Sequence, residues 1–168
     1  MCIRDRYKHI VATSQFADGD LDPDPVATAD AQCPAGYKSL FAYGAIRRAT
    51  TIPNQVVNPL DWVVQPYTYY VNENEVPVWL TDDVALLGVR DGKFVGLEKS
   101  ISGMTLTIFT GLKADWTTLV DENCEGWSLG TSSFFKHYGF AYSSGIDFLY
   151  SGGVSSCEYD SAFYCVEQ

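Results

Sequence analysis

The segment that decides the fold is the final stretch SSCEYDSAFYCVEQ, residues 155–168, in which Cys157 and Cys165 lie eight positions apart. Two thiols in such a position serve a metal site, a reactive nucleophile or the closing disulfides of a secreted domain. The chain contains five cysteines and two histidines, and no cysteine pair has the C-x-x-C spacing of zinc knuckles. We therefore expect no metal ion here and predict two disulfides formed in an oxidising compartment.

The first residues, MCIRDRY, contain neither the apolar core of a signal peptide nor a lipoprotein signal ahead of Cys2. They resemble a translated remnant of a sequencing adapter. Residues 1–7 are therefore predicted to be a non-native or disordered remnant, and Cys2 is left out of the disulfide count. Residues 8–168 are predicted to form a single domain, and we expect the export signal to be missing from this sequence.

Composition and charge exclude several classes of protein. The chain is 46% hydrophobic, which excludes wholesale disorder, and its 14% aromatic and 19% charged residues favour a sheet-rich, loop-rich extracellular domain. The formal net charge of -10 disfavours nucleic acid, anionic lipid and heparin as partners. No apolar run approaches the roughly 18 to 20 residues of a membrane span, so we expect no direct membrane insertion.

A helix is predicted within DPVATADAQCP, residues 24–34. Asp24 is a typical N-cap, Pro25 suits the first helical position, and Pro34 and Gly36 are stop signals. The apolar spacing inside the segment places Cys33 on the buried face of this helix.

The remainder of the chain reads as short strands and turns, and the predicted class is therefore α+β. Asp91 and Gly92 form the two-residue turn that β-hairpins prefer. The stretch from Ala42 to Thr81 is expected to be largely irregular. Short strands are predicted over residues 9–13, 61–64, 76–80, 104–109 and 162–168.

The pentapeptide GWSLG, residues 126–130, matches the G-x-S-x-G nucleophile elbow of serine hydrolases. That chemistry requires a strand, a sharp turn and a helix around Ser128, with a base and an acid later in the chain. The following segment has poor helix signals, and His137 comes only nine residues later. We favour a glycine-flanked turn, and a secreted hydrolase using Ser128 with His137 as base is the alternative.

Alternating acidic residues fill the loop DGDLDPDP, residues 18–25, and their oxygens suggest calcium. The loop lacks the glycine and the final acidic residue of a helix-loop-helix calcium site. We favour a solvated loop in which Asp24 caps the helix, with calcium as the weaker alternative. The candidate ligands are Asp18, Asp20, Asp22 and Asp24.

No cofactor is expected, because the chain has no glycine-rich phosphate loop and no basic stretch longer than Arg47-Arg48. The tryptophans fit either sugar stacking or a buried core, and the sequence does not separate these roles. They are Trp62, Trp79, Trp116 and Trp127.

Several ordered motifs carry a resemblance to a known family. IVATSQF opens the chain, PVATADAQC and NCEGWS surround Cys33 and Cys124, and YCVEQ closes it. In this order they resemble endostatin, C-type-lectin-like domains and, more closely, the bacterial endostatin-like domain of unknown function in spirochaete surface proteins. The resemblance runs from about Lys8 to Gln168.

This resemblance implies nested disulfides, Cys33 with Cys165 and Cys124 with Cys157, in a C-type-lectin-like fold whose termini meet. It also implies an exported or cell-surface location and a binding role, since spirochaete relatives attach to host matrix and complement-regulating proteins. The lectin calcium motifs, the zinc-binding histidines and the heparin-binding arginines of these relatives are absent. We therefore expect a non-catalytic module that binds a protein or a neutral glycan. A structural terminal domain of a longer surface protein is the other alternative.

Overall fold

The computed structural model describes residues 7–13, 17–53, 55–121 and 123–168. Cys2 and all but the last residue of the predicted N-terminal remnant lie outside these ranges. Tyr7 is described and begins the first strand, where it pairs with Tyr69.

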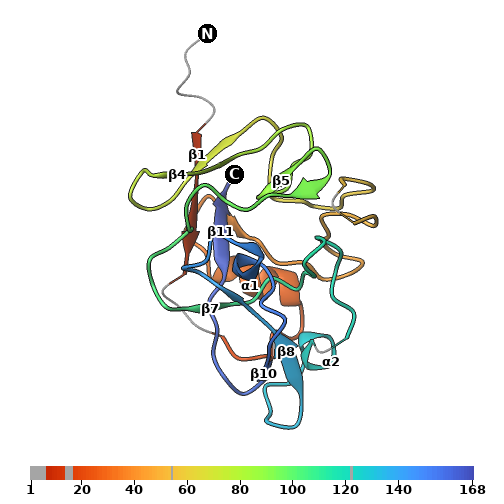
Figure 1. The fold of residues 1–168 in the computed structure, drawn as a ribbon. Coiled ribbons are helices and arrows are strands. Elements are labelled where there is room, and N and C mark those ends of the chain that lie inside the picture. Colours follow the sequence, from red (N-terminus) through yellow and green to blue (C-terminus); the bar gives the residue numbers. More distant parts are fainter. Residues whose placement is uncertain (1–6, 14–16, 54, 122) are drawn as a thin grey trace.

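A five-stranded sheet with the order β2-β11-β1-β3-β4 organises the molecule. The first and last strands are neighbours in it, with Val11 opposite Cys165 in an antiparallel ladder (Figure 1). The β1–β3 pair is parallel, and the other pairs of this sheet are antiparallel. The strands are β1 (Tyr7–Ala12), β2 (Tyr37–Ser39), β3 (Tyr69–Val71), β4 (Pro77–Leu80) and β11 (Tyr164–Glu167).

Three two-stranded antiparallel pairs and a few short helical turns surround this sheet. The pairs are β5 (Val89–Arg90) with β6 (Lys93–Phe94), β7 (Thr107–Ile108) with β9 (Gly139–Phe140), and β8 (Phe135–His137) with β10 (Val154–Ser156). The helical elements are α1 (Pro25–Ala31), α2 (Cys124–Trp127) and the 3-10 turn η2 (Ile146–Phe148). The prediction of a mixed α and β domain with short, mostly antiparallel strands and an N-terminal helix is confirmed.

The start of α1 follows the predicted signals. The Asp24 carboxylate accepts a hydrogen bond from the Ala27 N–H at 3.1 Å, and Pro25 occupies the first turn. The side chain therefore satisfies a backbone donor that the helix leaves unpaired.

The predicted end of α1 is wrong, because the helix stops at Ala31 and does not include Cys33. The N–H groups of Gln32 and Cys33 bond to carbonyls three residues earlier, at 3.2 and 3.0 Å, which tightens and closes the last turn. Cys33 is therefore half-buried beyond the helix.

The predicted hairpin is confirmed, since Asp91 and Gly92 have φ values of 52° and 71° between β5 and β6. Three of the predicted short strands are also confirmed, because β1, β4 and β11 lie where strands were predicted. The strand predicted over residues 61–64 is wrong, because Asp61 has a positive φ of 43° that breaks an extended backbone. The strand predicted over residues 104–109 is reduced to β7. Its backbone leaves β9 after Ile108, and the Phe109 N–H bonds to Ala162 instead.

Two clusters of buried side chains form the interior. The larger one contains Ile10 and Val166 from the central sheet. The smaller one gathers Phe109, Trp127 and Phe163 around a disulfide. Neighbouring residues at the start of β11 point to opposite sides, as in any strand, so this end of the chain contributes to both clusters.

Two disulfides join distant parts of the chain, in the same pairing that the resemblance implies. Cys33 pairs with Cys165 across 132 positions, with 5.5 Å between their Cα atoms. Cys124 pairs with Cys157 across 33 positions, with 5.8 Å between their Cα atoms. The first bridge ties the end of α1 to β11, and the second lies in the smaller cluster.

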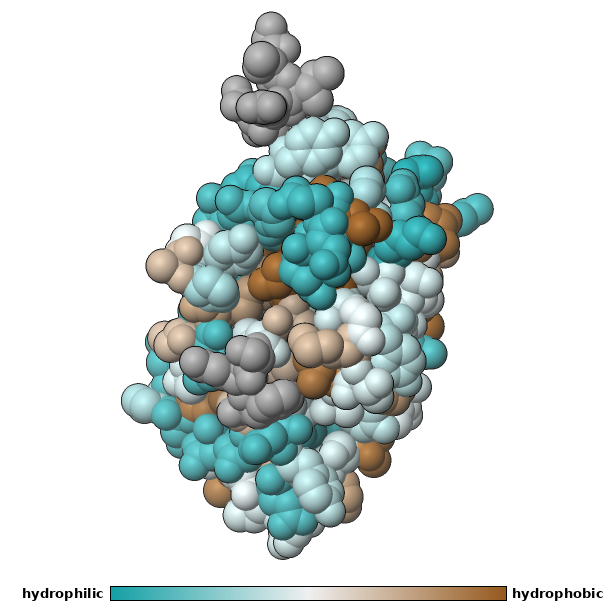
Figure 2. Space-filling model, turned by 90° about the vertical axis from the view of Figure 1, so that its left-hand side faces the viewer, coloured by the Kyte–Doolittle hydropathy of each residue, from teal (hydrophilic) through white to brown (hydrophobic). Residues whose placement is uncertain are grey.

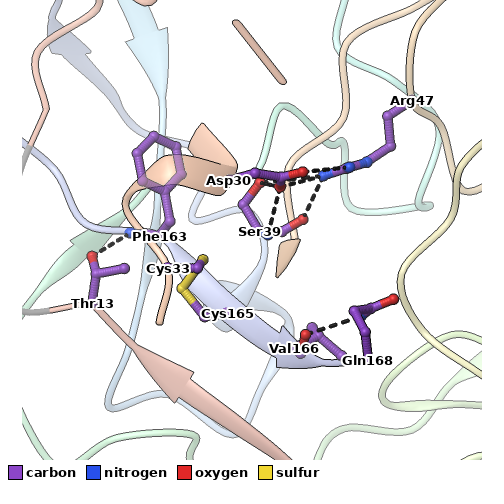
Figure 3. Close-up of a disulfide and its surroundings, with 9 residues drawn as sticks. All are labelled: Thr13, Asp30, Cys33, Ser39, Arg47, Phe163, Cys165, Val166 and Gln168. Carbon is purple, nitrogen blue, oxygen red and sulfur yellow. Dashed lines mark hydrogen bonds and ion pairs between the residues drawn. A yellow bond between two sulfur atoms is a disulfide. The ribbon is translucent and has the colours of Figure 1, made fainter. Parts of the chain in front are cut away.

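Arg47 is a buried cation beside the first disulfide, with 1% of its side chain exposed (Figure 3). It donates two hydrogen bonds to the Asp30 carboxylate, at 2.7 and 2.8 Å, and approaches Asp61 to 2.6 Å. Burial raises the pKa of Asp30, but hydrogen bonds from Arg47 and Ser39 outweigh it and hold that pKa below its usual value. The group links α1, β2 and the segment after residue 60.

The outer surface shown in Figure 2, on the side that is at the left of Figure 1, mixes hydrophilic regions with small apolar patches. Within the described ranges, no helix has the length and apolar character needed to cross a bilayer.

Candidate functional site

The element α2 is a single left-handed turn. Cys124, Glu125, Gly126 and Trp127 have φ values of 56°, 55°, 74° and 66°. Their hydrogen bonds are nonetheless helical, since the Trp127 N–H bonds to the Asn123 carbonyl at 2.7 Å. Left-handed residues normally occur singly, because the side chain approaches the following carbonyl. Four in succession are therefore unusual.

Strong tertiary contacts hold this turn. Cys124 is fixed by its disulfide, and Trp127 is 1% exposed and packs edge-on against Phe41 at a ring distance of 5.1 Å. The Asn123 side chain accepts a hydrogen bond from the Gly126 N–H at 3.0 Å. Gly126 is the residue best suited to a positive φ, and a Cβ there would lie 3.2 Å from the Tyr43 hydroxyl.

The conformation costs about 1 to 2 kcal/mol for each of the three residues that are not glycine. Such conformations persist where several contacts with the surrounding structure hold them in place, and they concentrate at functional sites. The turn therefore marks this end of the molecule, where Figure 1 also places β8 and β10, as the candidate functional site.

A cleft of about 630 Å³ opens against the turn. Gly126 and Cys124 form one wall, and Tyr43 stands beside them. The described residues that line it are Tyr43, Gly44, Thr118, Leu119, Val120, Asp121, Asn123, Cys124, Glu125, Gly126, Ser133, Phe134 and Phe135.

The described side chains around this cleft are apolar, neutral polar or acidic. Val120 is 67% exposed and Phe135 49% exposed, although both are large apolar residues. Asp121 and Glu125 supply exposed carboxylates. Lysine, arginine and histidine do not occur among the lining residues that the structure describes. The cleft therefore suits a ligand that combines an apolar surface with a positive charge.

Lys136 lies directly behind Phe135 and is fully buried. Its ammonium group donates to the carbonyl oxygens of Tyr159 and Cys157 and lies 3.7 Å from the centre of the Phe109 ring. Burial lowers the pKa of Lys136 to about 7, and the charges of two aspartates act in the opposite direction. These aspartates are Asp18 and Asp160. The lysine thus joins β8 to the loop that follows Cys157.

The two residues of the alternative hydrolase make hydrogen bonds to different partners. The Ser128 hydroxyl donates to the Glu125 carbonyl at 2.8 Å. The His137 ring contacts the Gly153 carbonyl through Nδ1 at 3.0 Å and lies tilted against the Tyr150 ring, with 4.6 Å between ring centres. Among the described residues, no hydrogen bond joins Ser128 to His137, so the relation that a nucleophile and its base require is missing.

The aspartates of the acidic loop bond to the backbone of their own loop. Asp18 accepts from the Asp20 N–H at 2.9 Å, and Asp20 accepts from the Asp22 N–H at 3.3 Å. Asp24 caps α1 as predicted. Across the described ranges, no group of three or more acidic, histidine or cysteine side chains is arranged to hold a metal ion.

The acidic loop packs on the left-handed turn. The Gly19 N–H donates to the Cys157 carbonyl and the Leu21 N–H to the Trp127 carbonyl, both at 2.8 Å. A Cβ at Gly19 would lie 2.4 Å from the Cys124 sulfur, so only glycine fits here. The loop is therefore a support of the cleft.

Three of the four tryptophans belong to the interior. Trp79, Trp116 and Trp127 are at most 3% exposed. Trp62 is half-buried and donates to the Ala85 carbonyl at 2.9 Å. Sugar stacking on the three buried rings is therefore excluded.

The sequence reasoning missed the residues that form the cleft. Phe135 belongs to no motif, and Glu125 stands in NCEGWS, which indicated a family resemblance but no left-handed turn. Lys136 stands in a run of polar and aromatic residues in which no element was predicted. Gly126, two residues after Cys124, was the one available signal.

The fold and the cleft define a small α and β domain with two disulfides. Residues 13–144 match the family described as "Protein of unknown function (DUF1554)". The match covers well over half of the chain, which therefore belongs to this family. It includes Cys33 and Cys124, whereas their partners lie beyond it. The comparison with curated proteins gave no match.

Proposed function

We propose that this protein is an exported or surface-displayed binding module without catalytic activity, and that it binds a protein ligand in the cleft beside the left-handed turn. The observation that carries the proposal is the pairing of a costly, disulfide-held backbone with exposed apolar and acidic side chains in one cleft. Binding energy at protein interfaces concentrates in such rigid, partly apolar pockets.

We further propose that the domain is endostatin-like and has a C-type-lectin-like fold. The nested disulfides and the pairing of β1 with β11 support this assignment, because both features are what the resemblance implies. The disulfides also support an extracytoplasmic location, since such bonds persist in oxidising compartments.

Charge selects the ligand class. The net charge of -10 and the carboxylates of Asp121 and Glu125 favour a partner segment that carries lysine or arginine. Phe135 and Val120 supply apolar surface for the stems of such side chains. A basic, partly apolar segment of a host matrix or complement-regulating protein has this chemistry.

The test measures binding of the oxidised chain to a panel of immobilised matrix glycoproteins and complement regulators at physiological salt. At least one protein should bind saturably. Phe135→Ala and Glu125→Gln should each weaken that binding about tenfold, as expected for residues at the centre of an interface. Tyr159→Ala removes an aromatic ring that is 61% exposed outside the cleft and should leave the affinity unchanged.

The proposal would be contradicted if no protein of the panel bound saturably. It would also be contradicted if Phe135→Ala and Glu125→Gln both bound with the affinity of the unmodified chain. The absence of catalysis is tested separately. A fluorophosphonate probe should not label Ser128, because the hydroxyl of that residue donates to a backbone carbonyl. Stoichiometric labelling that disappears in Ser128→Ala would establish the hydrolase alternative.

A further inference from the structure

A second hollow, of about 470 Å³, lies between the β3–β4 hairpin and β5, elements at the opposite end of the molecule from α2 (Figure 1). Its lining is mostly apolar with a few polar groups. The described residues that line it are Tyr67, Tyr69, Leu80, Thr81, Asp82 and Arg90. Small-molecule sites have this composition, in which aromatic surface supplies contact area and a few polar groups fix orientation.

The aromatic part of the hollow is held in place. Tyr69 pairs with Leu80 across the hairpin, and its ring stacks on Tyr7 at 5.5 Å. Tyr67 is 59% exposed and has a positive φ of 52°. Its N–H donates to the Asp82 carbonyl at 3.0 Å, which fixes the backbone in that conformation. The ring of Tyr67 is thus exposed on a rigid support.

The polar part offers one donor group and one acceptor group. Arg90 lies with its guanidinium 4.9 Å from the Trp79 ring centre, and no carboxylate in the described ranges pairs with it. Asp82 uses Oδ1 to accept from the Val84 N–H at 2.8 Å. Its Oδ2 has no hydrogen-bond partner among the described residues, so it remains available to a ligand.

We infer that this hollow binds a neutral pyranose sugar. A pyranose has an apolar C–H face, which stacks on an exposed ring such as Tyr67, and hydroxyl groups that both donate and accept. The Arg90 guanidinium donates to one hydroxyl oxygen, and the Asp82 carboxylate accepts from another. An anionic ligand is disfavoured by Asp82 and by the net charge of -10.

The hollow shares no residue with the cleft, so the inference does not depend on the proposed function. The test is a ¹H–¹⁵N shift titration of the whole chain with the methyl glycosides of glucose, galactose, mannose and N-acetylglucosamine. Each is added to about 50 mM, which is enough to saturate a site with a Kd of about 1 mM. At least one sugar should shift the amides of residues 67–69, 80–82 and 90 saturably.

Tyr67→Ala and Arg90→Met should each weaken this binding about tenfold, and their spectra report whether the fold is retained. Tyr67→Phe keeps the ring and should bind as the unmodified chain does. Phe135→Ala, in the cleft, should also leave sugar binding unchanged. Three results would overturn the inference: no saturable shift with any of the four sugars, shifts that persist in both weakening variants, or the same shifts caused by inorganic phosphate.

Discussion

Arg47 carries a positive charge inside the protein because Asp30 and Asp61 surround it with carboxylate oxygens. Removing a buried partner leaves uncompensated charge and unmade hydrogen bonds, which costs about 3 to 5 kcal/mol. We predict that Arg47→Ala lowers the free energy of unfolding by about this amount. Arg48→Ala, which removes one hydrogen bond to the Asn58 carbonyl, should cost about 1 kcal/mol. Urea denaturation measures both.

The same cluster determines how acid unfolds the protein. The pKa values of Asp30 and Asp61 are lowered in the folded state, where hydrogen bonds outweigh the opposing effect of burial. Their contribution to stability is therefore present above pH 4 or so, the unfolded pKa, and is lost as the pH falls through the folded value. In Arg47→Ala, the free energy of unfolding should therefore fall less steeply as the pH is lowered. The same dependence of stability on low pH in the variant and in the unmodified chain would contradict the assignment of this effect to the Arg47 cluster.

Lys136 should titrate near neutral pH. Because burial lowers its folded pKa to about 7, the folded protein binds fewer protons than the unfolded chain between about pH 7 and 10. The contribution of Lys136 to stability therefore rises with pH across that window. Side-chain NMR should show one lysine titrating near pH 7, and this signal should be missing in Lys136→Met. If the Lys136 signal titrates above pH 10, the account of its burial is wrong.

At the scale of elements, removing the strain of the left-handed turn should raise stability and weaken ligand binding. Glycine adopts φ 55° without the strain that Glu125 carries, but it also makes the unfolded chain more flexible. Glu125→Gly should therefore stabilise the protein by about 0.5 to 1 kcal/mol and weaken ligand binding, since the carboxylate is lost. Glu125→Gln should weaken binding without the gain in stability.

The same substitution at Glu98, an exposed residue without a positive φ, should lower stability. Thermal unfolding distinguishes these variants. Destabilisation by Glu125→Gly would show that the turn is not strained.

The two disulfides should differ in their effects. In the chain-entropy model, the bridge across 132 positions contributes about 5 kcal/mol and the bridge across 33 positions about 3.7 kcal/mol. Replacing Cys33 and Cys165 by serine should therefore cost more stability than replacing Cys124 and Cys157. The second replacement should abolish ligand binding under conditions where the domain remains folded, because it releases the turn. Equal loss of binding in both variants would contradict the claim that the Cys124–Cys157 bridge alone holds the turn for ligand binding.

Elements with local signals were predictable, and elements made by tertiary contacts were not. The cap at Asp24 and the turn at Asp91-Gly92 each depend on neighbouring residues, and both are present. Residues 61–64 read as a strand from their apolar residues, yet the Asp61 carboxylate bonds to Arg47, fourteen positions away. The cleft depends on a disulfide and on the packing of Trp127, which no short pattern encodes.

At the scale of the whole molecule, net charge determines which charged polymers the protein binds. A chain with a net charge of -10 repels sulfated polysaccharide, and the basic residues Lys38 and Arg47 are paired with carboxylates. We predict no retention on a heparin column at about 0.15 M salt, where the Debye length is about 8 Å. Retention at this salt concentration would reveal a basic cluster that the fold does not explain.

The central claim is that a protein ligand binds in the cleft beside the left-handed turn. Hydrogen–deuterium exchange of the chain, alone and with the protein that binds it in the panel, tests this claim most directly. We predict slower exchange at residues 118–121, 123–126 and 133–135, which line the cleft, and unchanged exchange at residues 67–69 and 80–90. Slower exchange that avoids the three cleft segments and lies elsewhere on the domain would contradict the account.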